Sequence, residues 1–232
     1  MAFDVKNTTF CGILDLLCPH TCRGCGTRGE LLCKCCKKYI SEVHVNICPK
    51  CHREIASGQK RCLDCKKMPF EASFVYGFRE GILPELVKEY KYQAVRDYAR
   101  ILAEFYAEMI PDDFSDGREV VVVPLPTVAK HIRERGFDHI LMIGKKLAKM
   151  KKWQCHSVLL RANKSVQVGA NEKVRLRQAA EAYKVEAKLD TEKMYLLIDD
   201  VWTTGASMLA ACKEMQKAGA RHLSAAVLEV SK

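Results

Sequence analysis

The sequence MYLLIDDVWTTGAS, residues 194–207, decides the expected fold of this chain. It begins with a short apolar run, continues with the adjacent carboxylates Asp199 and Asp200, and ends in a loop of small and hydroxyl residues before a helical pattern. An apolar run bounded by turn residues is typical of a buried parallel strand, and open α/β sheets bind ligands in loops at the carboxyl ends of such strands. We therefore expect an α/β domain with a mainly parallel sheet and a ligand site at this strand end.

Two kinds of ligand-binding group meet in this stretch. The loop consists of Thr203, Thr204, Gly205, Ala206 and Ser207. A small-residue loop that leads into a helix presents free N–H groups and a positive dipole end to a phosphate. Asp199 and Asp200 suit ribose hydroxyls or a hard cation such as Mg²⁺. A phosphate cradle beside diol-binding carboxylates predicts a site for a phosphorylated ribose.

Strand-like runs alternate with helical patterns from residue 73 to residue 230, which favours the α/β class. One of these runs, residues 120–123, leads into a loop that carries Lys130, Arg133 and Arg135. Arginine suits bidentate capture of phosphate oxygens, so these cations are a second phosphate-binding candidate. A charged helix surface is the alternative interpretation.

The composition indicates a folded protein with only a mild basic character. Of the 232 residues, 48% are hydrophobic, which is enough for a packed core. The formal net charge is +10, but eight zinc-bound thiolates and two zinc ions would lower it to about +6. Charge alone is therefore a poor argument for a nucleic-acid partner.

The first 65 residues carry four CxxC pairs. These are Cys22/Cys25, Cys33/Cys36, Cys48/Cys51 and Cys62/Cys65. Two intervening residues let one tight turn present both sulfurs to a metal, and four thiolates complete a closed structural site, so the pairs predict two zinc ions. Sequential pairing closes the shorter loops, although an interleaved pairing is equally allowed by count. Redox chemistry is a weaker rival, because it needs one CxxC pair beside a βαβ unit rather than four in series.

We expect a small double zinc-ribbon domain at residues 1–70, held together by metal, and an α/β domain at residues 71–232. The apolar segment at residues 10–17 is short and interrupted by Asp15, so neither a membrane span nor a signal peptide is predicted. A cytoplasmic location without membrane insertion is expected, where clustered CxxC pairs indicate metal sites rather than disulfides.

Residues 196–207 resemble the phosphoribosyl-pyrophosphate (PRPP) signature of type I phosphoribosyltransferases, and nearly the whole chain resembles the ComF family. That family joins a double zinc ribbon to a phosphoribosyltransferase-like domain. The matched features are the four CxxC pairs, the segment GFREGILPELVKEYKY at residues 77–92, the turn Arg135-Gly136-Phe137-Asp138, and a stretch with Gln167, Arg175 and Gln178. Asp138 and Gln178 stand where the family usually has asparagine, and Trp202 is unusually bulky for the loop.

The resemblance implies a type I phosphoribosyltransferase-like fold and a PRPP site. Asp199 and Asp200 would be the catalytic, ribose-binding residues, directly or through Mg²⁺, and the loop from Thr203 to Ser207 would hold the 5′-phosphate. Lys130, Arg133 and Arg135 would face the pyrophosphate. The family is linked with DNA uptake in natural competence, which implies contact with single-stranded DNA and a competence helicase or DNA-processing partner. The alternatives are a metabolic phosphoribosyltransferase acting on a nitrogen acceptor, and a zinc-ribbon DNA-binding module.

Overall fold

The computed structural model describes residues 20–56, 59–62, 65, 68–93, 95–161 and 182–231. The main strands are β1 (Ala72–Phe78), β2 (Val120–Pro124), β3 (Gln154–Cys155), β6 (Met194–Trp202) and β7 (His222–Val230). They form one five-stranded sheet in the order β1-β7-β6-β2-β3, and every pair of neighbours is parallel. A separate antiparallel pair joins β4 (Leu159–Arg161) to β5 (Tyr183–Val185). The expected α/β class with a mainly parallel sheet is confirmed.

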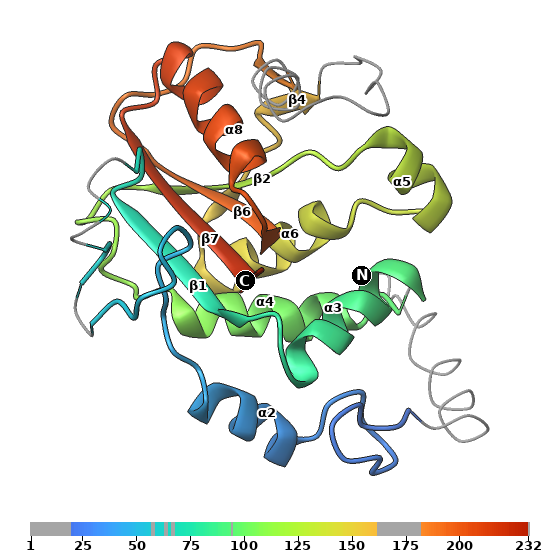
Figure 1. Cartoon of the computed structure of the whole chain (residues 1–232). Helices are drawn as coiled ribbons and strands as arrows, with labels where there is room; N and C mark the ends of the chain where they lie inside the picture. Colours follow the sequence, from blue (N-terminus) through green and yellow to red (C-terminus); the bar gives the residue numbers. More distant parts are fainter. Residues whose placement is uncertain are drawn as a thin grey trace, which may run out of the picture.

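Helices cover both faces of this sheet (Figure 1). They are α2 (Lys34–Glu42), α3 (Ile82–Tyr92), α4 (Tyr98–Met109), α5 (Ala129–Arg135), α6 (His139–Lys151) and α8 (Ala206–Lys217). Leu196 and Ile198 of β6 pack into the core beneath α3, α4 and α6, whereas Tyr195 and Leu197 pack into the core beneath α8. Because successive strand residues point to opposite faces, burial on both sides explains the uninterrupted apolar run of β6.

The connections of the two central strands diverge at the carboxyl edge of the sheet. From β2 the chain passes through α5 and α6 to β3, while from β6 it passes through α8 to β7 on the other side. Such a switch point leaves a crevice above the strand ends, which is where open α/β sheets bind ligands. The fold therefore places a crevice between the ends of β2 and β6.

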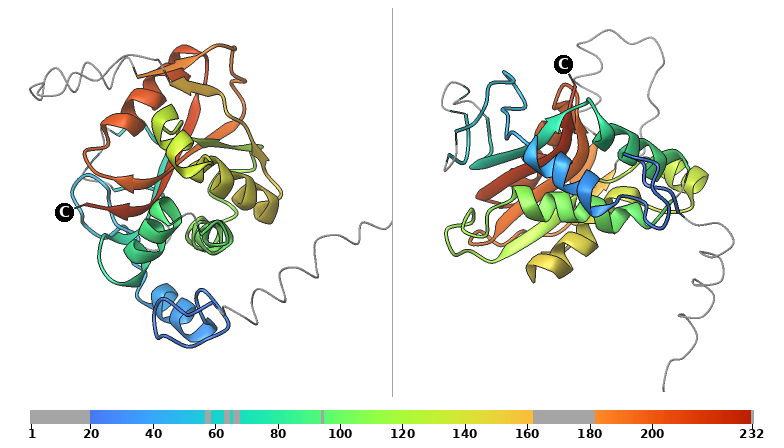
Figure 2. Two further views of the ribbon diagram at one scale, coloured as in Figure 1. Left: turned by 90° about the vertical axis from the view of Figure 1, so that its right-hand side faces the viewer. Right: turned by 90° about the horizontal axis from the view of Figure 1, so that it is seen from below.

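The cysteine-rich segment packs against the body of the α/β fold. Cys22, Leu32 and Ile40 belong to the same buried cluster as the inner residues of α3 and α4. Lys37 of α2 makes an ion pair of 2.7 Å with Glu104 of α4, and Figure 2 shows α2 beside the α3–α4 layer. The described part of this segment thus shares a core with the α/β fold, and the boundary near residue 70 stays a prediction.

Residues from this segment also form hydrogen bonds with β1, a strand at the edge of the sheet. The Ser73 N–H donates to the carbonyl oxygen of Lys60 at 2.9 Å, and the Val75 N–H donates to Asn46 Oδ1 at 3.0 Å. His44 stacks on the ring of Tyr76 with 4.2 Å between ring centroids. The backbone of the outermost strand therefore finds hydrogen-bond partners outside the sheet.

Some sequence-based predictions fall outside the described residues. These are the predictions on residues 10–17 and on the stretch with Gln167, Arg175 and Gln178. Within the described ranges, none of the helices combines the length and hydrophobicity that crossing a bilayer demands.

Candidate functional site

The two adjacent aspartates lie near the carboxyl end of β6 and have different surroundings. Asp200 is only 6% exposed, and its Oδ2 lies 2.6 Å from Lys91 Nζ of α3 and 2.6 Å from His139 Nε2 of α6. Asp199 is half-buried, and its Oδ1 accepts the Asp200 N–H at 3.0 Å. Asp200 is therefore held by a lysine and an imidazole, whereas Asp199 borders open space.

A cavity of about 170 Å³ opens over the ends of β2 and β6. Its polar lining consists of Lys91, Thr127, His131, Arg135, His139, Arg161, Tyr183, Asp199, Asp200 and Ser207. Three of these side chains are cationic and two are imidazoles, against two carboxylates. This balance suits an anionic ligand that also carries hydroxyl groups.

The loop at residues 203–207 surrounds a smaller hollow of about 40 Å³ that shares Asp199 and Ser207 with the cavity. Gly205 caps α8 with φ of 73°, and the Ala206 N–H donates to Thr204 Oγ1 at 3.3 Å. The first-turn N–H groups of a helix have no acceptor within the helix. The loop therefore presents hydrogen-bond donors and the positive end of α8 to the crevice.

The Trp202 side chain is buried beneath this loop. The residue ends β6, is 5% exposed, and contacts Phe70 edge-on with 6.4 Å between ring centroids. A Cβ atom added at Gly205 would lie only 2.1 Å from the Trp202 ring. The bulky residue is thus accommodated because a glycine with positive φ lies directly on its ring.

The electrostatics of the aspartate pair are asymmetric. Burial, followed by the charge of Asp200, raises the pKa of Asp199 well above its ordinary value. Burial alone would raise the pKa of Asp200 too, but the hydrogen bond to His139 and the charge of Lys91 hold it below its ordinary value. The negative charge of the pair is therefore concentrated on Asp200, and Asp199 is free to bind a hydroxyl or a cation.

Of the three cations predicted on the loop after β2, the structure brings one to the cavity. Arg135 lines the cavity and lies over the Tyr92 ring at 5.5 Å. Lys130 is 72% exposed and lies 3.7 Å from Glu134, and Arg133 is also exposed. Among the described residues these two do not line the cavity, because α5 turns them toward the outside.

The sequence did not single out Lys91, His139, Arg161 or Tyr183. Arg161 donates to the Pro126 carbonyl oxygen at 3.3 Å and lies over the Tyr183 ring at 5.6 Å, so the β4–β5 pair covers one side of the cavity. For Lys91 a signal existed, since it falls within the segment at residues 77–92 that resembles the ComF pattern. The other three carried no signal of their own in the sequence.

Two groups of four cysteines each gather their sulfurs within 4.8 Å of one another. One group is Cys22, Cys25, Cys33 and Cys36, and the other is Cys48, Cys51, Cys62 and Cys65. The CxxC pairs are thus combined sequentially, and the interleaved alternative does not occur. Two structural zinc ions, one for each group, fit these ligands.

The geometry of both groups suits a tetrahedral metal. The Cys25 and Cys33 sulfurs lie 3.6 Å apart, as do those of Cys51 and Cys62. A zinc ion bound at about 2.3 Å separates its sulfurs by about 3.8 Å. The Cys33 N–H also donates to the Cys22 sulfur at 3.3 Å. These are the donor type, number and spacing of a structural zinc site.

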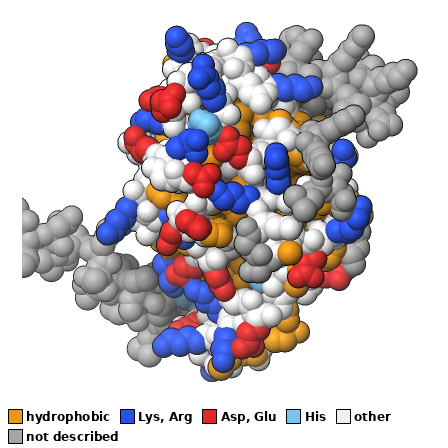
Figure 3. All heavy atoms as spheres, turned by 90° about the vertical axis from the view of Figure 1, so that its left-hand side faces the viewer, with side chains coloured by type: hydrophobic (Ala, Val, Ile, Leu, Met, Phe, Trp, Pro, Cys, Tyr) orange, Lys and Arg blue, Asp and Glu red, His pale blue; other side chains and the backbone are white. Residues whose placement is uncertain are grey.

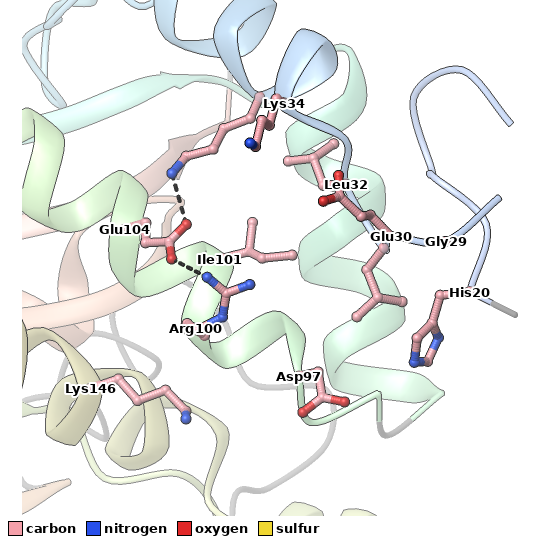
Figure 4. Close-up of a pocket in the computed structure, with 12 residues that line it drawn as sticks. His20, Gly29, Glu30, Leu32, Lys34, Asp97, Arg100, Ile101, Glu104 and Lys146 are labelled. Carbon is pink, nitrogen blue, oxygen red and sulfur yellow. Dashed lines mark hydrogen bonds and ion pairs between the residues drawn. The ribbon is translucent and has the colours of Figure 1, made fainter. Parts of the chain in front are cut away.

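A second cavity of about 530 Å³ lies between residues 29–32 and α2 on one side and helices α4 and α6 on the other (Figure 4). Its cations are Lys34, Lys37, Arg100 and Lys146. Glu104 pairs with Lys37 at 2.7 Å and with Arg100 at 2.5 Å. The cavity is therefore mixed in charge, and the face of the molecule in Figure 3 also intersperses basic and acidic side chains.

No protein-family model matches this sequence, and a search of curated proteins finds no matching relative. The α/β fold, the paired cysteine clusters and the crevice chemistry are therefore the basis for the functional inference.

Proposed function

We propose that this chain is a PRPP-binding, phosphoribosyltransferase-like protein of the ComF type, with its site in the crevice between β2 and β6. The observation that carries the proposal is the 170 Å³ cavity itself. It joins a carboxylate pair, three cationic side chains and Ser207, the last residue of the small-residue loop, within one crevice. A phosphorylated ribose with a pyrophosphate group needs all three kinds of contact.

Each part of PRPP has a matching group in this arrangement. The N–H groups of the loop at residues 203–207 would bind the 5′-phosphate, and Asp199 would accept hydrogen bonds from the ribose hydroxyls. Arg135 and Lys91 would face the pyrophosphate, whose departure from the anomeric carbon accompanies attack by a nitrogen nucleophile. Fixed cations that face the departing oxygens stabilise the charge that develops on them. The protein would thus act mainly by positioning and electrostatics.

Mg²⁺ is proposed only as an ion that accompanies PRPP. The cavity-facing carboxylate of Asp199 would hold it, since Asp200 Oδ2 already accepts from Lys91 and His139. When bound, the ion would disperse pyrophosphate charge.

Calorimetry with PRPP and Mg²⁺ on the zinc-loaded chain tests the proposal. The wild type is expected to bind, and Asp199→Asn is expected to weaken binding by about tenfold or more, because an amide lacks the second oxygen that the ribose hydroxyls and Mg²⁺ would contact. Asp112→Asn, at a side chain that is 87% exposed, is the matched control and should bind normally. The absence of heat at millimolar PRPP would refute the proposal.

The identity of the nitrogen acceptor distinguishes a metabolic phosphoribosyltransferase from a protein of the ComF type. Pyrophosphate release measured across a panel of nucleobases and amines is expected to identify any nitrogen acceptor. Robust turnover with a small base would favour the metabolic alternative. Binding of PRPP without turnover on any member of the panel would favour the ComF-type role.

Contact with single-stranded DNA is a second proposal, which rests on two lysines of the 530 Å³ cavity. Lys34 and Lys146 line it and have no ion-pair partner among the described residues. Gel shifts at several salt concentrations are expected to show weaker binding at higher salt, with a shallower slope for Lys34→Gln combined with Lys146→Gln. Lys213→Gln, on the exposed side of α8, is the control. A salt-independent shift would contradict phosphate contacts.

A further inference from the structure

His139 links the anion-binding and carboxylate sides of the cavity. It is the first residue of α6, is 7% exposed, and lies between two charged side chains. Its Nε2 is 2.6 Å from Asp200 Oδ2, and its Nδ1 is 3.1 Å from Arg135 Nη1. Tyr90 fixes the backbone at this point, since its hydroxyl donates to the His139 carbonyl oxygen at 2.8 Å.

The neighbours of the ring determine which nitrogen carries the hydrogen. A guanidinium only donates hydrogen bonds, so His139 Nδ1 must accept from Arg135. Nε2 therefore carries the hydrogen and donates it to Asp200. Thr127 also lies 3.2 Å from Nδ1, but its hydroxyl donates to Asp138 Oδ1 at 3.0 Å. The ring is thus held in one tautomer by groups from α5 and β6.

The contacts continue on both sides of the imidazole. Lys91 of α3 holds the same Asp200 oxygen at 2.6 Å, which fixes the carboxylate that anchors the ring. On the other side, the Arg135 guanidinium lies over the Tyr92 ring, which is 73% exposed. The Lys91–Asp200–His139–Arg135 series thus joins four different elements, and Arg135 ends it on α5, the helix that follows β2.

We propose that His139 is a positioning residue for Arg135. Anchored on Asp200 through Nε2, it holds the guanidinium with Nδ1 at the wall of the cavity, where Arg135 captures the oxygens of a pyrophosphate group. Asp200 thus helps to orient Arg135 by fixing the His139 ring, whereas Asp199 is the carboxylate that faces the ligand. The identity of the anion rests on the PRPP proposal, but the orientation of Arg135 does not.

Two amide substitutions separate the roles of the ring nitrogens. A glutamine amide reaches the position of Nε2, and an asparagine amide reaches that of Nδ1. With inorganic pyrophosphate as the calorimetric probe, His139→Gln is expected to weaken binding about tenfold, because Arg135 loses its acceptor. His139→Asn keeps that acceptor and should bind more tightly than His139→Gln. His222→Gln, a histidine paired with Glu71 at the start of β7, is the matched control.

A double-mutant cycle distinguishes positioning from a general loss of structure. Adding His139→Gln to Arg135→Gln is expected to weaken pyrophosphate binding little beyond the loss from Arg135→Gln alone. Fully additive losses would overturn the proposal. So would equal binding by wild type and His139→Gln.

Nitrogen-15 NMR of the ligand-free protein provides a readout independent of any ligand. The His139 signal, assigned by its loss in His139→Gln, is expected to show the tautomer with hydrogen on Nε2, and the opposite tautomer would overturn the proposal. If the wild type binds pyrophosphate but not PRPP, the proposed function fails while the positioning role stands. If PRPP binds and His139→Gln has no effect, the positioning role fails alone. If neither anion binds, both fail.

Discussion

Glu229 of β7 is a buried carboxyl group whose replacement tests the electrostatics of the crevice. The side chain is 1% exposed, and its Oε1 has no hydrogen-bond partner in the part of the chain that the structure describes. Its Oε2 lies 3.7 Å from Nε of Arg79, which is itself 61% exposed. Burial, followed by the charge of Asp200, raises the pKa of Glu229 from 4.5 to about 7.

The raised pKa makes stability depend on pH in a defined direction. Between pH 4.5 and about 7 the native state keeps the Glu229 proton while the unfolded chain has lost it, so the free energy of unfolding falls as pH rises. A rise in pKa from 4.5 to about 7 corresponds to about 3 kcal/mol at 25 °C. Glu229→Gln removes this ionisation. The variant is therefore expected to gain up to about 3 kcal/mol relative to wild type between pH 5 and pH 8.

Urea unfolding of the zinc-loaded proteins at several pH values measures this gain. Wild type and variant share both cysteine clusters and Asp199, so their difference isolates Glu229. Glu192→Gln, at an exposed position, is the control and should show no pH-dependent difference. A constant difference between Glu229→Gln and wild type from pH 5 to pH 8 would refute the reasoning.

The remaining predictions concern the loop, the aspartate pair and the metal clusters. Gly205→Ala would place a methyl group against the Trp202 ring at a backbone position with positive φ. We therefore expect a lower melting temperature and loss of PRPP binding in calorimetry. A variant with the wild-type melting temperature and affinity would contradict this close contact. Asp200→Asn leaves Lys91 unpaired and is expected to lower the free energy of unfolding by about 3 kcal/mol, whereas Asp199→Asn should lower it far less in the same denaturant titration. Metal analysis is expected to find two zinc ions per chain, and serine in place of any one cluster cysteine should release one of them; a content near zero would exclude both sites.

The sequence predicted the features that depend on local pattern. The apolar run of residues 194–198 is a central parallel strand because both of its faces are covered. The CxxC spacing predicted the metal clusters, since each turn brings its two sulfurs together without help from the rest of the fold. Glycine and hydroxyl residues after the aspartates indicated a loop that leads into a helix, and α8 begins at Ala206.

The sequence could not predict contacts made between distant elements. His139 and Asp200 are 61 residues apart, and only the packing of α6 on β6 brings them together. Nothing in the sequence distinguished the two adjacent aspartates. Their side chains point to opposite faces of β6, so Asp200 gains a lysine partner and Asp199 faces the cavity. Similarly, Lys130 and Arg135 lie at opposite ends of α5, and only Arg135 lines the cavity.

The hydrogen bonds that Asn46 and Lys60 make with β1 have a consequence for aggregation. An uncovered terminal strand is a template on which the same strand of another copy can add. Lys60 and Asn46 occupy backbone N–H groups of β1 that such a copy would otherwise bind. These two residues lie close to the second cysteine cluster in sequence, so a metal ion that orders this cluster would also keep the sheet edge covered. Chelation is therefore expected to produce oligomers that grow with protein concentration and that dissolve when zinc is restored.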